Sequence, residues 1–294
     1  MKNWRQYTPG ELGRQYDNRS AVPGHKEIFR DWEKRSRLAC EELGGARDLA
    51  YGPHPRQTLD LFVPADLASP APLHVFLHGG YWQAMNKESS GFIARGLVQA
   101  GVAVAVVGYR LCPEVSIEEI VQDVRDALVW LHRNGAAHHV DASRVQVSGH
   151  SAGGHLAAML WTTDWTHQAP ELPVDFLHSA ISVSGLYELE PLLSTRVNDA
   201  LGLDVPRARD LSPALAEPIC RAPFLLAVGE AESEEYHRQS YFLRERWEEK
   251  DVPVEVATLK DHHHFSIVEE LADREGVICK KALEFWAKGG NRGR

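Results

Sequence analysis

The segment VQVSGHSAGGHLAAML (residues 145–160) places a serine between two glycines, where an apolar strand pattern passes into a helical one. Residues 144–149 form a short β-branched run, and the small apolar residues after Gly153 are typical of a buried helix. Small residues on both sides of Ser151 let neighbouring backbones approach a sharp turn that bulkier side chains would block. In this context the G-x-S-x-G pattern predicts a nucleophilic serine at the top of a sheet.

Two alternatives exist for the glycine-rich turn at residues 149–154, namely a turn without chemistry and a phosphate-binding loop. A phosphate loop of the common kind ends in Gly-Lys-Ser or Gly-Lys-Thr, whereas here Gly154 is followed by His155 and Leu156. The missing lysine argues against the phosphate loop. The turn without chemistry stays open on this stretch alone.

Seven apolar runs of strand length alternate with helical patterns from about residue 58 onwards. Continuous β-branched runs suit strands covered on both faces, so the alternation predicts a mainly parallel sheet with helices on both sides. Residues 115–134 have the clearest helical period among the intervening segments. We therefore expect one α/β domain over residues 1–294, with a central sheet of about eight strands. The apolar runs are residues 58–63, 72–78, 102–109, 144–149, 176–185, 223–229 and 252–259.

Two segments depart from this alternation. Residues 1–50 are polar and aromatic, and residues 184–222 contain prolines and short helical pieces. Ligands of open α/β sheets bind at the carboxyl ends of the strands, where such segments can cover a site. We expect both to be cap-like, the first as an N-terminal segment and the second as an insertion.

The composition excludes several classes of partner. The formal net charge of −9 and the lack of a long Lys/Arg run argue against binding to nucleic acid or to an anionic membrane. No run approaches the roughly 20 apolar residues that span a bilayer, and the N-terminus lacks the apolar core of a signal peptide, so we expect a cytoplasmic protein. The cysteines lie far apart without a CxxC spacing, which indicates reduced thiols without a redox or zinc role. They are Cys40, Cys112, Cys220 and Cys279.

The sequence His-Gly-Gly-Tyr-Trp at residues 78–82 follows a predicted strand and suits an oxyanion loop. A nucleophilic serine needs hydrogen-bond donors for the negative oxygen that develops on the substrate. We expect these donors to be the backbone amides of Gly80, Tyr81 and Ala152, the residue after the serine.

The aromatic side chains of this loop have two interpretations. Tyr81 and Trp82 are bulky enough to narrow the acyl pocket or to stack on an aromatic substrate, so both are candidate substrate-binding residues. Trp82 is equally suited to anchoring the loop in the core. His78 follows a buried strand, and we expect it to satisfy backbone groups rather than to act on substrate.

A base and an orienting acid should follow the serine, in the order carboxylate and then histidine. Residues 230–235 (EAESEE) follow one predicted strand, and residues 260–265 (KDHHHF) follow the next. One imidazole should take the proton of Ser151 while a carboxylate fixes its tautomer. Consecutive histidine side chains point in different directions, so a metal site is not expected. The other two histidines are expected in solvent.

Four motifs together resemble the kynurenine formamidase (arylformamidase) branch of the α/β-hydrolase superfamily, near the hormone-sensitive-lipase-like esterases. The likeness extends over most of the chain and includes RQYDNR at residues 14–19. It implies an α/β-hydrolase fold without a cofactor. The motifs are HGGYW at residues 78–82, GHSAGG at 149–154, ESEEYHRQS at 232–240 and HHFSIVE at 263–269.

The same resemblance implies a catalytic triad of Ser151, Glu232 and His264. The family usually has aspartate where this chain has Glu232, which leaves Glu230 and Glu234 as rivals. A tyrosine at position 81, where the neighbouring esterases have glycine, favours the formamidase side.

The implied activity is hydrolysis of an aryl N-formyl amide such as N-formylkynurenine through an acyl-enzyme. A small-acyl carboxylesterase is the nearest alternative, because the same machinery cleaves small-molecule esters. A non-catalytic binding module is the alternative of another class, but such proteins usually lose a triad member and this chain has a candidate for each. Arylformamidase-like chains are often dimers, which leaves a homodimer open.

Overall fold

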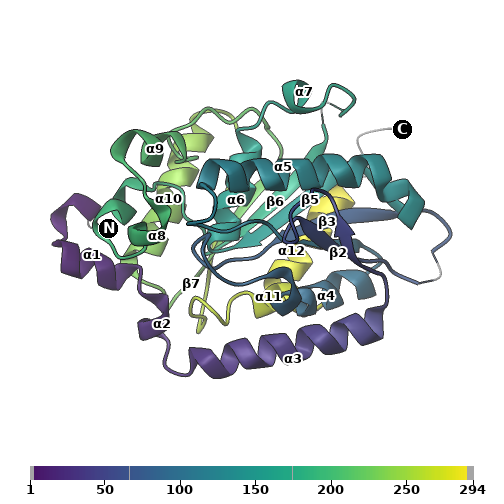
Figure 1. Ribbon diagram of the computed structural model, residues 1–294, viewed down its shortest axis with the longest axis horizontal. Helices are drawn as coiled ribbons and strands as arrows, with labels where there is room; N and C mark the ends of the chain where they lie inside the picture. Colours follow the sequence, from purple (N-terminus) through teal and green to yellow (C-terminus); the bar gives the residue numbers. More distant parts are fainter. Residues whose placement is uncertain (1–2, 66, 174, 290–294) are drawn as a thin grey trace.

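The computed structural model describes residues 3–65, 67–173 and 175–289 and places an eight-stranded sheet between two layers of helices (Figure 1). The strand order is β1-β2-β4-β3-β5-β6-β7-β8. The β1–β2 and β2–β4 pairs are antiparallel, and all the other pairs are parallel. The strands are β1 (Ala46–Ala50), β2 (Thr58–Phe62), β3 (Ala71–Leu77), β4 (Ala103–Val107), β5 (Val140–His150), β6 (Leu177–Val183), β7 (Phe224–Gly229) and β8 (Val254–Leu259).

The strands β2, β3, β4, β6, β7 and β8 contribute apolar side chains to both helical layers, as the apolar runs predict. In β4, for example, Ala105 packs into one hydrophobic cluster while Val104 and Val106 pack into the other. One layer contains α5 (Ile117–Asn134), α6 (Ala152–Trp161) and α10 (Glu234–Glu248), and the other contains α3 (His25–Leu43), α4 (Ala94–Gln99), α11 (Glu269–Ala272) and α12 (Val277–Gly289). The α/β-hydrolase fold expected from the sequence is confirmed.

Helix α5 shows how the local sequence builds this layer. The Ser116 side chain accepts a hydrogen bond from the Glu119 amide, and Glu119 reciprocates at the Ser116 amide, so a capping box fixes the start of the helix. The apolar stripe recognised in the sequence faces the sheet. Its buried members are Ile117, Ile120, Val121, Val124, Leu128 and Leu131.

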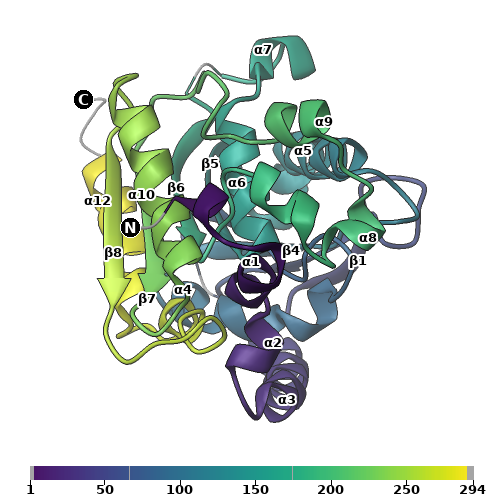
Figure 2. The same ribbon diagram turned by 90° about the vertical axis from the view of Figure 1, so that its left-hand side faces the viewer.

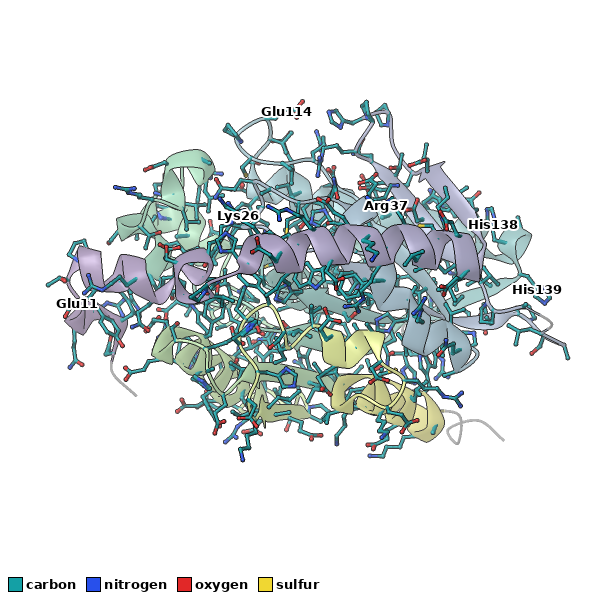
Figure 3. All side chains as sticks on the ribbon, turned by 90° about the horizontal axis from the view of Figure 1, so that it is seen from below. Glu11, Lys26, Arg37, Glu114, His138 and His139 are labelled. Carbon is teal, nitrogen blue, oxygen red and sulfur yellow. The ribbon has the colours of Figure 1, made fainter. Side chains whose placement is uncertain are left out.

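The eighth strand, β1, comes from residues 1–50, which the sequence suggested were a cap-like segment. Residues 25–50 belong instead to the layered body, since β1 pairs with β2 and α3 runs along the outside of the sheet (Figure 3). Helix α3 buries Trp32, Ser36 and Ala39 at helical spacing, so its inner face is part of the core.

Helices α1 (Pro9–Gln15), α2 (Asn18–Ala21), α8 (Asn198–Leu201) and α9 (Val205–Asp210) lie at the left end of the molecule in Figure 1, and Figure 2 shows that end facing the viewer. Gln239 of α10 joins the N-terminal segment to the loop after β6, because its side chain accepts the amides of Tyr187 and Glu188 and donates to the Tyr16 hydroxyl. Arg238 pairs with the Glu188 carboxylate at 2.7 Å. Among the described residues, no helix combines the length and the apolar composition that a bilayer crossing requires.

The first turn of α6 lies against the end of β3 with no room for a side chain. A Cβ at Gly153 would lie 2.0 Å from the Leu77 carbonyl oxygen and 2.6 Å from that of His78. Both obstacles are backbone atoms, which cannot rotate away. The glycine therefore sets how closely the helix after Ser151 approaches the sheet.

We expect Gly153→Ala to lower the free energy of unfolding by at least about 1–3 kcal/mol, the usual cost of forcing extra volume into a packed site. Urea denaturation of the purified variant measures this. Gly13→Ala in α1 is the matched control, since an added Cβ there meets nothing within 4 Å. The control should be neutral or stabilised by up to about 1 kcal/mol. Equal stability of the two variants would refute the close approach.

Candidate active site

Ser151 occupies a strained turn between β5 and α6. Its backbone angles, φ 57° and ψ −118°, lie in a region that residues with side chains rarely adopt. The Ser151 amide donates to the Val183 carbonyl at 2.8 Å, and a Cβ at Gly149 would lie 2.0 Å from the Gly153 oxygen. The flanking glycines are thus required by backbone contacts, and the turn presents the serine to a cleft.

His264 and Glu232 form a buried hydrogen-bonded pair beside this cleft. His264 Nδ1 lies 2.7 Å from Glu232 Oε2, and the two side chains are 5% and 1% exposed. The other carboxylate oxygen, Oε1, accepts from the Ser184 hydroxyl at 2.6 Å and from the Gly229 amide at 2.8 Å. Both carboxylate oxygens are occupied, so the glutamate is held in one orientation.

The electrostatics of this pair favour an ionised glutamate. Burial by itself raises the pKa of Glu232, but the nearby His264 and the hydrogen bonds from Ser184 and the Gly229 amide hold that pKa below its ordinary value. A carboxylate facing Nδ1 favours the tautomer that carries its proton there. His264 Nε2 is then free to accept a proton.

The structure separates the three candidate carboxylates. Glu230 is exposed and accepts from the Asp261 amide at 3.3 Å, while Glu234 is exposed and accepts from the Tyr7 hydroxyl at 2.7 Å. Of the three, Glu232 is the one that contacts an imidazole of the histidine triplet.

The other two histidines of the triplet are half-buried rather than solvated. His262 Nε2 lies 3.2 Å from a Glu270 oxygen, and His263 Nδ1 accepts the amides of Phe265 and Ser266. The two rings contact different groups in and near the loop after β8 and do not face a common point. No group of three or more metal-binding side chains is found within the part of the chain that the structure describes.

His150 is a site residue that the sequence analysis missed. Its Nε2 donates to the His264 carbonyl at 2.7 Å, and the two rings are 4.9 Å apart. Burial, aided by the neighbouring His264, lowers the pKa of His150 to about 3, so the ring is neutral. It holds the backbone that carries His264. The sequence feature that could have identified His150 is its position, since it is a polar residue at the end of a buried strand and directly before the serine.

The loop at residues 78–82 lies beside Ser151. Gly80 has φ 108°, and a Cβ there would lie 2.2 Å from the Ala84 oxygen. Gly80 and Tyr81 line the same cleft as Ser151. Among the described residues, no acceptor faces the amides of Gly80, Tyr81 or Ala152. His78 Nδ1 donates to the Gly79 carbonyl at 2.8 Å, the backbone role expected for it, and its ring stacks on Tyr109 with centroids 4.1 Å apart.

Tyr81 is tied to the N-terminal segment by a buried hydroxyl network. Its hydroxyl donates to the Tyr16 carbonyl at 2.7 Å and lies 2.8 Å from the Tyr236 hydroxyl. The only proton of the Tyr81 hydroxyl goes to that carbonyl, so Tyr236 donates to Tyr81. Asn18 donates to the Tyr236 hydroxyl at 2.7 Å.

Tyr236 stands directly beside the candidate nucleophile and base. Its ring centroid is 4.7 Å from that of His264. Burial raises the pKa of Tyr236, while hydrogen bonds with Asn18 and Ser151 act to lower it. Asn18 and Tyr236 were missed as site residues, although both lie in motifs on which the family resemblance rests. Their spacing in the sequence carried no sign that they meet.

Trp82 does not line the cleft, so the interpretation of Trp82 as a substrate-binding residue is wrong. Its side chain is fully buried and packs edge-on against His155, with ring centroids 4.9 Å apart. Tyr81 and Trp82 both have positive φ, 49° and 57°, and the loop turns Tyr81 to the roof and Trp82 to the core. The alternative, an anchoring tryptophan, describes its position.

The cleft over Ser151 has a volume of about 820 Å³. This lies in the range of small-molecule sites. Four parts of the chain line it: residues 9–29, the loop at 80–85, the turn at 150–151 and residues 194–197, together with His264 and Phe265. Both segments expected to be cap-like thus contribute to its walls.

Comparisons with known proteins agree on the fold and the relatives. The BD-FAE family model matches residues 59–183. Kynurenine formamidase of Danio rerio is 32% identical over 98% of this chain and 100% of its own length, and that of Salmo salar is 31% identical over 97% and 95%.

Two solved structures are similar over most of their length. A Silicibacter sp. tm1040 protein with a provisional thioesterase assignment has a TM-score of 0.80 at 33% identity, covering 92% of this chain and 98% of its own. Esterase B of Lactobacillus rhamnosis has a TM-score of 0.69 at 20% identity, covering 93% and 95%. At that lower identity the likeness concerns the fold.

The lowered pKa of Glu232 has a consequence for stability. A carboxyl whose folded pKa lies below the unfolded value of about 4.3 stabilises the fold above that pH, and the contribution is lost as the pH falls through the folded pKa. Between about pH 6 and pH 3, the wild type should therefore lose more free energy of unfolding than Glu232→Gln does. Urea titrations at both pH values test this. Glu230→Gln, changed at an exposed site, should follow the wild type, and a Glu232→Gln curve parallel to both would contradict the shift.

Proposed function

Because this chain belongs to the kynurenine formamidase family and has the α/β-hydrolase fold, we propose that it hydrolyses aryl N-formyl amides such as N-formylkynurenine, with Ser151 as nucleophile. The observation that carries this proposal is the 2.7 Å bond between Glu232 and His264 beside a cleft that also contains Ser151. These residue types in this arrangement suit a nucleophile, a base and an orienting acid.

In the first half of the reaction, Ser151 Oγ attacks the formyl carbon while His264 Nε2 takes the hydroxyl proton. The carbonyl oxygen becomes negative and accepts hydrogen bonds from the amides of Gly80, Tyr81 and Ala152. The C–N bond then breaks as His264 returns the proton to the nitrogen, which leaves as an aryl amine. Ser151 is left as the formyl ester.

In the second half, His264 takes a proton from water, and the resulting hydroxide oxygen attacks the formyl ester. The same backbone amides stabilise the second oxyanion, and the bond to Ser151 Oγ breaks as His264 protonates it. Formate leaves and the serine is restored. Throughout, Glu232 keeps Nδ1 protonated and stabilises the imidazolium that forms twice per turnover.

The side chains around Ser151 favour a substrate with a small acyl group. Tyr236 and Tyr81 stand beside the serine with their hydroxyls bound to each other, to Asn18 and to the Tyr16 carbonyl. Side chains fixed by several buried hydrogen bonds do not move aside without leaving polar groups unpaired. A formyl group, with one hydrogen on its carbon, is the acyl unit that needs least room.

A small-acyl carboxylesterase remains the second candidate, since an ester meets the same nucleophile, base and amides. A non-catalytic binding module is disfavoured because every group that the chemistry needs has a candidate here. The four cysteines are free, in keeping with our proposal of a cytoplasmic enzyme.

Removing the nucleophile should abolish turnover. We expect Ser151→Ala to lower kcat by a factor on the order of 10⁶ without loss of the fold, since the turn accepts a small side chain. His264→Ala and Glu232→Ala should also be severely impaired, and Glu230→Ala should stay near the wild type. Steady-state kinetics with circular dichroism of each variant measure this. Retention of a tenth of the activity by Ser151→Ala would exclude it as the nucleophile.

The substrate is tested with the leaving group held constant. We expect kcat/KM to fall steeply from aryl formyl to acetyl to butyryl esters, and N-formylkynurenine to be hydrolysed. Some acetyl ester cleavage should persist, because pocket contacts of one methylene are worth only about 1–3 kcal/mol. Preference for butyryl esters with no turnover of N-formylkynurenine would instead identify a carboxylesterase.

A further inference from the structure

Three arginines line the mouth of the cleft that contains Ser151. Arg14 lies at the end of α1, Arg19 in α2, and Arg196 between η5 (Glu190–Ser194) and α8. They come from the two segments that cover the strand ends, and all three are exposed. We call Arg14, Arg19 and Arg196 the arginine rim.

The guanidinium groups of the arginine rim have no partner in the described part of the chain, where none makes an ion pair or a side-chain hydrogen bond. Other arginines of the same region do form ion pairs: Arg5 and Arg209 both pair with Glu190, and Arg238 pairs with Glu188. The nearby glutamates are thus already engaged elsewhere. The rim is left as positive charge facing a cleft.

The rest of the cleft does not neutralise this charge. Among the described residues, Asp17 is the one carboxylate side chain that lines the cleft, and one of its oxygens accepts the Ser20 amide at 3.1 Å. His150, also on the wall, is neutral because burial lowers its pKa to about 3. Three arginines and one aspartate leave the mouth with a net positive charge, in a chain whose net charge is −9.

From this arrangement we propose that the arginine rim binds a carboxylate carried by the leaving group of the substrate. Guanidinium matches a carboxylate with two parallel hydrogen bonds, and the pairing is strong where water is partly excluded. Tyr81 lines the cleft together with Ser151, and its hydroxyl is fixed by the Tyr16 carbonyl and Tyr236, so we place the small acyl group on that side. The carboxylate therefore belongs to the aryl part, which extends from Ser151 toward the mouth.

This inference rests on the proposed function for the position of the leaving group, and it assigns a recognition role to the two covering segments. A neutral aryl substrate would gain nothing from the arginine rim. An anionic one would be attracted to the mouth and then oriented, with its scissile carbonyl toward the oxyanion loop. The rim would thus act mainly on kcat/KM for anionic substrates.

The test compares two esters that differ at one group, 3-acetoxybenzoate and its neutral analogue 3-acetoxybenzamide, together with N-formylkynurenine. The variants are Arg14→Gln, Arg19→Gln, Arg196→Gln and the triple substitution. Arg37→Gln is the matched control, because Arg37 is also exposed and without a side-chain partner among the described residues, but lies midway along α3, away from α1 (Figure 3).

We expect the wild type to prefer the carboxylate ester, and each rim substitution to lower kcat/KM for that ester and for N-formylkynurenine roughly ten-fold, the loss typical of one charged hydrogen bond. The amide ester should be unaffected, which also shows that each variant is folded. The preference of the wild type should weaken with added salt. Arg37→Gln should match the wild type on every substrate.

Equal effects on the charged and neutral esters, or no effect of the triple substitution on either, would overturn the inference. A loss of the same size in Arg37→Gln would also overturn it, as a general effect of surface charge. The proposed function fails in a different way: N-formylkynurenine would be inert while the rim variants still discriminate between the two esters.

Discussion

The positive φ of Ser151 is the constraint on which the rest of the site depends. Turning from β5 into α6 within one residue brings the helix so close to the sheet that Gly149 and Gly153 meet backbone atoms, as the 2.0 Å distances from their added Cβ atoms show. Backbone strain of this kind persists only where surrounding contacts fix it. Here the Ser151 amide is held by the Val183 carbonyl of the adjacent strand, so the sheet itself aims the serine.

The buried carboxylate of Glu232 is the second constraint on the site, because its charge must be stabilised away from water. Moving a charge out of water is costly unless hydrogen bonds and an opposite charge replace the lost hydration. Glu232 obtains these from Ser184, which follows β6, from the amide of Gly229, the last residue of β7, and from His264 in the loop after β8. Parallel strands deliver such residues to one edge, because all their carboxyl ends face the same way. The fold therefore brings the site residues together and also supplies the hydrogen bonds that keep Glu232 ionised.

The N-terminal segment forms one wall of the cleft. The Tyr16 carbonyl and Asn18 fix the hydroxyls of Tyr81 and Tyr236, while Gln239 holds Tyr16 to α10. The same few residues bring Arg14 and Arg19 to the mouth. These contacts add a wall and a rim to a scaffold that shares its fold with esterases.

The sequence by itself determined the parts that local pattern encodes. The seven apolar runs became β2 to β8, the stripe of residues 117–131 became the buried face of α5, and G-x-S-x-G marked the turn at Ser151. It did not reveal that β1 completes the sheet or that Trp82 turns inward. Nor did it show that His150 holds the His264 backbone or that Asn18 reaches Tyr236, 218 residues away. Periodicity and turn chemistry act between neighbours in the chain, whereas these contacts depend on which surfaces packing brings together. Only the tertiary structure decides which residues meet, because a buried polar group needs a hydrogen-bond partner and that partner can lie far away in the sequence.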